Sequence, residues 1–133
     1  MIKRVFTTFL TVSLVMMSLP TQAAPSGTIS GTFCDAVKDG NTVKITAGGT
    51  YNAYNTSKND YQINGFRIDL RNNGGQQLRS TGLVSISPAY TYTAIDSWTI
   101  PYKEASSLKD MKMFFYNGGA KKAESVWINC SWT

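Results

Sequence analysis

The sequence predicts an all-β domain, a small antiparallel β-sandwich of Greek-key or immunoglobulin-like type with seven or eight strands. A small closed barrel is the second choice. Three observations favour this class: glycine and asparagine recur at short intervals, no long window repeats apolar residues at helical spacing, and short segments alternate between apolar and polar residues. Many short strands separated by turns in one modest chain are typical of sandwiches and barrels.

The N-terminal segment, residues 1–23, is predicted to be a cleaved signal peptide. Lys3 and Arg4 provide a short positive start, and a mostly apolar run follows over residues 5–19. This order of charged and apolar residues is typical of export signals. The run is shorter than the roughly 20 residues that a spanning helix needs, so we expect no membrane anchor.

Cleavage is expected between Ala23 and Ala24, because small residues precede that bond. The mature protein would then be a single domain of residues 24–133, either secreted or periplasmic. Of the 13 basic residues only Lys3 and Arg4 are lost, so 11 remain against 8 acidic residues, a net charge of +3. The basic residues are too dispersed to predict a nucleic-acid interface.

The first part of the mature domain is predicted to form three strands. Asp39 and Gly40 have the sequence of a tight hairpin turn, and a second turn is expected at Gly48 and Gly49. An exposed polar loop is expected over residues 55–60. The three strands are predicted over residues 28–34, 42–47 and 50–55.

The clearest strand pattern lies over residues 61–71, where apolar and charged residues alternate. The apolar parity consists of Phe66, Ile68 and Leu70. The charged parity consists of Arg67, Asp69 and Arg71. Because successive side chains of a strand point to opposite faces, the first set is predicted to face the core and the second set the solvent.

The second half of the domain is predicted to form further strands and one short helical stretch at residues 103–109. The expected strands cover residues 77–87, 90–100, 111–116 and 124–132. In the last of these, one parity is expected to form the apolar face: Val126, Ile128, Cys130 and Trp132.

The two cysteines, Cys34 and Cys130, lie near opposite ends of the mature domain. An exported chain passes through an oxidising compartment, so we predict one disulfide that joins the N-terminal and C-terminal strands. Two free thiols are the alternative.

The absence of histidine excludes several common sites. No Ser-His-Asp triad and no histidine-containing zinc site can form, and two cysteines alone do not make a zinc site. The polar loop at residues 55–60 lacks the spacing of a dedicated calcium loop. We therefore expect no metal and no cofactor.

Three tyrosines are the first candidate ligand-binding residues. The predicted mature domain has 7 Tyr, 3 Trp and 4 of the 6 Phe, more rings than one inner face of a small sandwich requires, so some should be exposed. Tyr51, Tyr54 and Tyr61 flank the polar loop and are suited to stacking on sugar rings or on a protein partner. The alternative is that these tyrosines only cover the rim of the core.

Three charged residues of one strand are the second candidate group. Arg67, Asp69 and Arg71 are spaced two apart, a spacing at which the aspartate can bridge both arginines and the guanidinium groups can meet an anionic ligand. The alternative is an ordinary ion-pair ladder on the surface.

The function that this sequence favours is an exported, non-catalytic binding module for a glycan or for a component of the cell envelope or host surface. The alternative is a protein-contact factor, such as a hydrolase inhibitor, an immunity protein, a toxin delivery subunit, or a surface or pilus component. We expect no enzyme, because a glycosidase needs two neighbouring carboxylates and Asp96, the one acid in an aromatic strand, has no evident partner.

Overall fold

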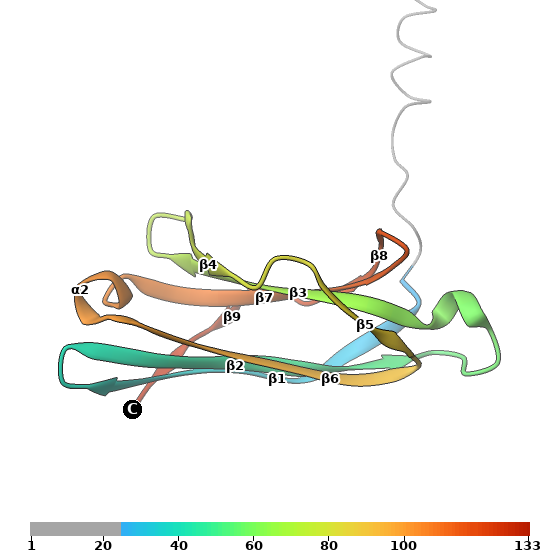
Figure 1. Ribbon diagram of the computed structural model, residues 1–133, viewed down its shortest axis with the longest axis horizontal. Helices are drawn as coiled ribbons and strands as arrows, with labels where there is room; N and C mark the ends of the chain where they lie inside the picture. Colours follow the sequence, from blue (N-terminus) through green and yellow to red (C-terminus); the bar gives the residue numbers. More distant parts are fainter. Residues whose placement is uncertain (1–24) are drawn as a thin grey trace, which may run out of the picture.

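A computed structural model describes residues 25–133, so the predicted signal peptide and its cleavage site lie outside the described residues. These residues are 69% strand and 6% helix and form two facing sheets, as Figure 1 shows. The all-β sandwich predicted from the sequence is thus confirmed.

The first sheet has four strands in the order β10-β1-β2-β6. In this order, β10 spans Ser131–Trp132, β1 spans Gly27–Asp39, β2 spans Thr42–Ala53 and β6 spans Thr91–Pro101. The hairpin turn predicted between β1 and β2 is present, and Gly40 adopts a positive φ there.

The second sheet has six strands, with β4-β3-β7-β8 in order, β5 pairing with β3, and β9 pairing with β7. In chain order, β3 spans Ile63–Asn72, β4 spans Gln77–Ser80 and β5 spans Val84–Ala89. After β6, β7 spans Leu108–Asn117, β8 spans Ala120–Glu124 and β9 spans Ile128–Asn129. Two short helical segments complete the fold, η1 (Asn59–Tyr61) before β3 and α2 (Tyr102–Ala105) between β6 and β7.

The core lies between the two sheets and is built by alternate residues of the long strands. On β3, Phe66, Ile68 and Leu70 are buried, as their parity predicts. The largest fully buried side chains come from both sheets: Tyr51, Phe115, Ile45, Ile63, Ile68, Leu70, Met111, Met113 and Val43.

The predicted turn at Gly48 and Gly49 is wrong, because β2 continues through both residues. A Cβ at Gly48 would lie 2.4 Å from the carbonyl oxygen of Ala94, and one at Gly49 would lie 2.8 Å from the sulfur of Met113. The glycines therefore allow neighbouring atoms to approach the strand closely, which is the other role of glycine within strands.

Two further strand predictions are wrong in their bounds. The segment predicted over residues 77–87 forms two strands, β4 and β5, because residues 81–83 leave the ladder and Gly82 has a φ of +66°. Both strands nevertheless place Leu78, Val84 and Ile86 against the core, as expected.

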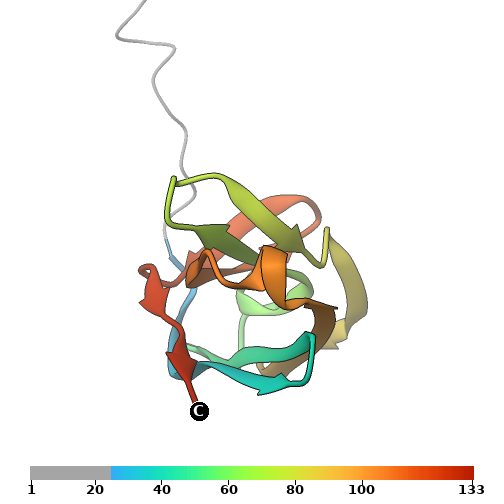
Figure 2. The same ribbon diagram turned by 90° about the vertical axis from the view of Figure 1, so that its left-hand side faces the viewer.

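The segment predicted over residues 124–132 is not one strand but the end of β8 followed by β9 and β10. The chain crosses here from the second sheet to the first, which Figure 2 shows in red. Ile128 and Cys130 pack on the core as expected, whereas Val126 and Trp132 are 74% and 40% exposed. Unlike the other strand pairs of the described chain, β10 and β1 are parallel.

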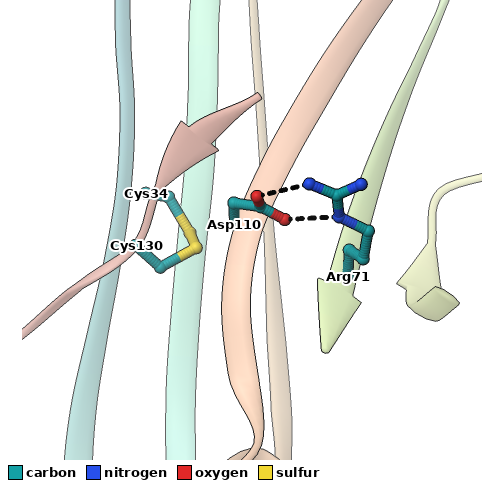
Figure 3. The surroundings of a disulfide bond; sticks show 4 residues. All are labelled: Cys34, Arg71, Asp110 and Cys130. Carbon is teal, nitrogen blue, oxygen red and sulfur yellow. Dashed lines mark hydrogen bonds and ion pairs between the residues drawn. A yellow bond between two sulfur atoms is a disulfide. The ribbon is translucent and has the colours of Figure 1, made fainter. Parts of the chain in front are cut away.

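The predicted disulfide is confirmed and lies at this crossing. Cys34 on β1 and Cys130 are bonded with their Cα atoms 4.5 Å apart. Figure 3 shows the bond beside β7. It fixes the C-terminal crossing to the first sheet, and it fits an oxidising, extracellular environment.

Candidate functional site

Tyr51 is not available to a ligand, which corrects its place among the candidate residues. The side chain is fully buried, and its ring lies 5.4 Å from that of Phe115. Its hydroxyl donates to the carbonyl oxygen of Tyr61 at 2.7 Å and lies 2.7 Å from the Ser26 hydroxyl. Burial raises the pKa of the Tyr51 hydroxyl above its ordinary value of 10.0, and the hydrogen bond with Ser26 opposes this rise.

Tyr61 and Tyr54 differ in exposure and in surroundings. Tyr61 ends η1 and is partly buried, with the Lys58 ammonium 5.9 Å from its ring centre. Tyr54 follows β2 and is 62% exposed. Of the three predicted tyrosines, Tyr54 is therefore the one that presents most of its ring to solvent.

Tyr54 stands at the wall of a groove, which we call the β1–β8 groove. It has a volume of about 390 Å³ and lies between the start of β1 and the edge of β8. Its lining residues are Pro25, Gly27, Thr28, Ile29, Tyr54, Lys121, Lys122, Ala123 and Glu124. The volume is within the usual range of small-ligand sites.

The groove exists because β1 and β8 border the same side of the sandwich without forming a continuous ladder. A hydrogen bond from the Ser26 backbone N–H to the Lys122 carbonyl oxygen, at 2.9 Å, joins the two sheets at one point. At Gly27 a Cβ would lie 2.6 Å from the Tyr51 ring, so β1 can pack this closely against that ring only with glycine at this position.

Glu124 and the neighbouring lysines supply the charge of the groove. The Lys121 ammonium lies 3.0 Å from the Glu124 carboxylate, and Lys112 lies 3.4 Å from it on the outer face of the second sheet. The hydrogen bond from Lys121 lowers the pKa of Glu124, with a further contribution from Lys112, so this carboxylate is ionised at neutral pH. Lys122 lines the groove in addition.

The groove contains a single carboxylate, Glu124. Paired-carboxylate hydrolysis requires a second acid within about 5 to 10 Å. Asp96 lies elsewhere, on β6, where its carboxylate accepts a hydrogen bond from the Ser97 backbone N–H at 2.7 Å. The described lining residues offer an aromatic face, cations, one anion and backbone groups.

The arginines of β3 point to the outer face of the second sheet, as predicted, but the pairing differs. Asp69 is bound by Arg67 at 3.1 Å and by the Ser80 hydroxyl at 2.6 Å. Arg71 instead makes two hydrogen bonds, of 2.9 and 2.7 Å, with Asp110 on β7, as Figure 3 shows. Asp69 therefore does not bridge both arginines, although their spacing in the sequence allows it.

Aromatic rings also cover both guanidinium groups. The guanidinium carbon of Arg67 lies 4.3 Å from the centre of the Phe114 ring, and that of Arg71 lies 3.8 Å from Trp127. Such stacking and charge pairing stabilise the arginines in place. Since each arginine already has an anion and a ring, the ion-pair interpretation of this row is favoured over anion binding.

A second hollow, of about 280 Å³, lies near the turn between β7 and β8. Asn64, Leu83 and Tyr116 are among its lining residues, and none of its lining residues is charged. The β1–β8 groove is thus the better candidate. Sequence analysis missed its charged wall, because Lys121, Lys122 and Glu124 follow a hairpin turn that is typical of solvated surfaces.

A scan against models of known protein families gives no match, and a search of curated proteins gives none either. Over residues 25–133, no helix has the length and apolar character that a membrane crossing requires.

Proposed function

We propose that this protein is an exported, non-catalytic binding module that holds a glycan, or a glycan-bearing component of the cell envelope or host surface, in the β1–β8 groove. The observation that carries the proposal is the exposed ring of Tyr54 at the wall of a concave, charged groove. Sugar rings present C–H faces and hydroxyl edges, so an aromatic face beside charged hydrogen-bonding groups matches their chemistry.

Each groove residue has a distinct role in this proposal. Tyr54 stacks on a sugar ring, Glu124 accepts hydrogen bonds from sugar hydroxyls, and Lys122 attracts a carboxylate, sulfate or phosphate on the glycan. Lys121 holds Glu124 in its ionised form. A binding role at the surface also agrees with the export that the sequence predicts from residues 1–23 and with the disulfide.

A glycan-array screen of the disulfide-bonded protein tests the proposal. We expect a signal on a defined set of glycans, and we expect Tyr54→Ala to weaken binding by about five- to thirtyfold, because loss of a stacking ring removes on the order of 1 to 2 kcal/mol of binding. Tyr102→Ala is the matched control, because Tyr102 is 40% exposed and begins α2, which lies at the opposite end of the sandwich from β8 (Figure 1).

Two results would contradict the proposal. The first is an array without any glycan signal from a folded, oxidised sample. The second is an equal loss of glycan signal in Tyr54→Ala and Tyr102→Ala, because the loss would then not depend on a residue of the groove.

One observation favours the alternative, a protein-contact factor. The backbone N–H of Tyr54 bonds the Ser26 carbonyl, so by the alternation of an antiparallel ladder the backbone groups of Gly27 and Ile29 point away from β2. An extended peptide could pair with this edge. In that case pull-down from an envelope extract would recover a protein, and Tyr54→Ala would leave its recovery unchanged.

A further inference from the structure

We propose that the open edge of β6 is a self-association surface, on which β6 of a second copy pairs antiparallel to form one continuous sheet across two molecules. This inference is independent of the β1–β8 groove, because β6 lies at the opposite edge of the first sheet from β1 and β10.

The edge is long and uncovered. In the described chain, β6 ends the first sheet and pairs with β2 alone, as Figure 1 shows along the lower sheet. It pairs residue by residue from Thr91 to Pro101 with no register shift. Among the other edges, β4, β5, β8 and β10 have 4, 6, 5 and 2 residues. The outer edge of β1 is covered by β10 only at Asp35 and Ala36, but a register shift between Ser30 and Phe33 interrupts it.

Hydrogen bonds at the two ends of β6 show which backbone groups face the open edge. The Ala53 N–H bonds the Tyr90 carbonyl, and the Tyr102 N–H bonds the Asn41 carbonyl. Hydrogen-bonded pairs alternate in an antiparallel ladder, so the even-numbered residues of β6 bond to β2. The N–H and C=O groups of the odd-numbered residues therefore point to the open edge: Thr91, Thr93, Ile95, Ser97 and Thr99.

The side chains of the same residues favour pairing with another strand. They are short hydroxyl residues around one isoleucine, and Ile95 is 54% exposed. β-branched residues suit strands, and β6 contains no Lys or Arg, the residues that commonly protect an edge.

The edge is complementary to itself in one register. Pairing centred on Ile95 places the two Ile95 side chains against each other and hydroxyls against hydroxyls, Thr93 with Ser97 and Thr91 with Thr99. It also places Asp96 opposite Ala94 of the second copy. Pairing centred on Asp96 would instead oppose two carboxylates, which is unfavourable. Asp96 therefore disfavours the register centred on its own position, and the register centred on Ile95 is the one that we propose.

Asp96 also limits the strength of pairing. Its carboxylate accepts a hydrogen bond from the Ser97 N–H at 2.7 Å, and this donor is one that pairing needs. Association must exchange that bond for one to the second copy. We expect Asp96→Ala to release the donor and to tighten association by about tenfold, the usual scale for a hydrogen bond to a charged group.

Sedimentation velocity over a concentration series tests the proposal on the disulfide-bonded protein. We expect a reversible monomer–dimer equilibrium. Ile95→Lys and Ile95→Glu should each give monomers, since like charges then meet at the centre of the interface. An equal mixture of the two variants should recover dimers, because the charges become opposite.

Val37→Lys is the control, since Val37 is an apolar residue of β1 that is 47% exposed, and β2 lies between β1 and β6, so it should leave association unchanged. The proposal is overturned if the wild-type protein stays monomeric at millimolar concentration. It is equally overturned if dimers persist in both Ile95 variants, or if the mixture of folded variants stays monomeric.

Discussion

Tyr51 shows how much a single side chain contributes to this fold. Its ring packs in the core against Phe115, and its hydroxyl joins the Ser26 hydroxyl to the carbonyl oxygen of Tyr61. These contacts tie the start of β1 and the end of η1 to β2. Because the groove wall at Gly27 rests on the Tyr51 ring, this buried residue also shapes the candidate site.

Tyr51→Phe should destabilise the protein by about 1 to 2 kcal/mol at neutral pH, because it leaves the Ser26 hydroxyl and the Tyr61 carbonyl without their partner. Urea unfolding measures the change. Tyr54→Phe, whose hydroxyl is on an exposed residue, should leave the free energy of unfolding unchanged. Equal effects of both substitutions would contradict the role given to Tyr51.

Because the pKa of Tyr51 is raised in the folded protein, the free energy of unfolding should depend on pH in the alkaline range. The neutral hydroxyl is favoured in the folded state, so its contribution is complete below pH 10 and is lost as the pH rises through the raised value. Urea unfolding from pH 8 upward should therefore show the difference between wild type and Tyr51→Phe shrinking above about pH 10. A difference that grows there would contradict the account.

At the scale of elements, β2 decides both the fold and the candidate site. Val43, Ile45 and Ala47 face the core, and Tyr51 has the same parity and is buried with them. An expected turn at Gly48 and Gly49 interrupts that parity, which is why the sequence interpretation placed Tyr51 at the surface. Two adjacent glycines fit a turn and a close approach within a strand equally well, and only packing against other strands decides between them.

Other elements could be predicted because one local pattern determined them. The alternation around Phe66, Ile68 and Leu70 gave the correct buried face of β3. The partner of Arg71 could not be predicted, since Asp110 comes from a strand 39 residues away and the pairing depends on sheet order. For the same reason Lys121 and Glu124 could not be placed in a groove with Tyr54.

Gly48→Ala should destabilise the protein by about 1 to 3 kcal/mol, the usual cost of overpacking, because the new Cβ would meet the Ala94 carbonyl oxygen at 2.4 Å. Thermal unfolding measures this change. Gly74→Ala is the matched control, since the nearest atom to its Cβ is the Asn72 side-chain oxygen at 3.4 Å. If Gly48→Ala were as stable as the control, the close-approach explanation of a continuous β2 would be wrong.

At the scale of the whole molecule, the disulfide joins the two sheets where the chain crosses between them. Cys34 and Cys130 are 96 residues apart in sequence, so the bond closes most of the domain into one loop. Replacing both by alanine should lower the free energy of unfolding by about 4 to 5 kcal/mol through unfolded-state entropy. Urea unfolding of the double variant, beside the reduced wild type, measures it. Unchanged stability would contradict the role of the bond.

If the β1–β8 groove holds the ligand, its lining residues must respond when the ligand binds. The most direct measurement is an NMR titration of the isotope-labelled protein with the glycan that gives the strongest array signal. We expect shifts of backbone signals from residues 27–29 of β1, from Tyr54 and from residues 121–124, which line the groove. Shifts confined to the outer face of the second sheet, around Arg67 and Arg71, or no shifts at all, would contradict binding in the groove.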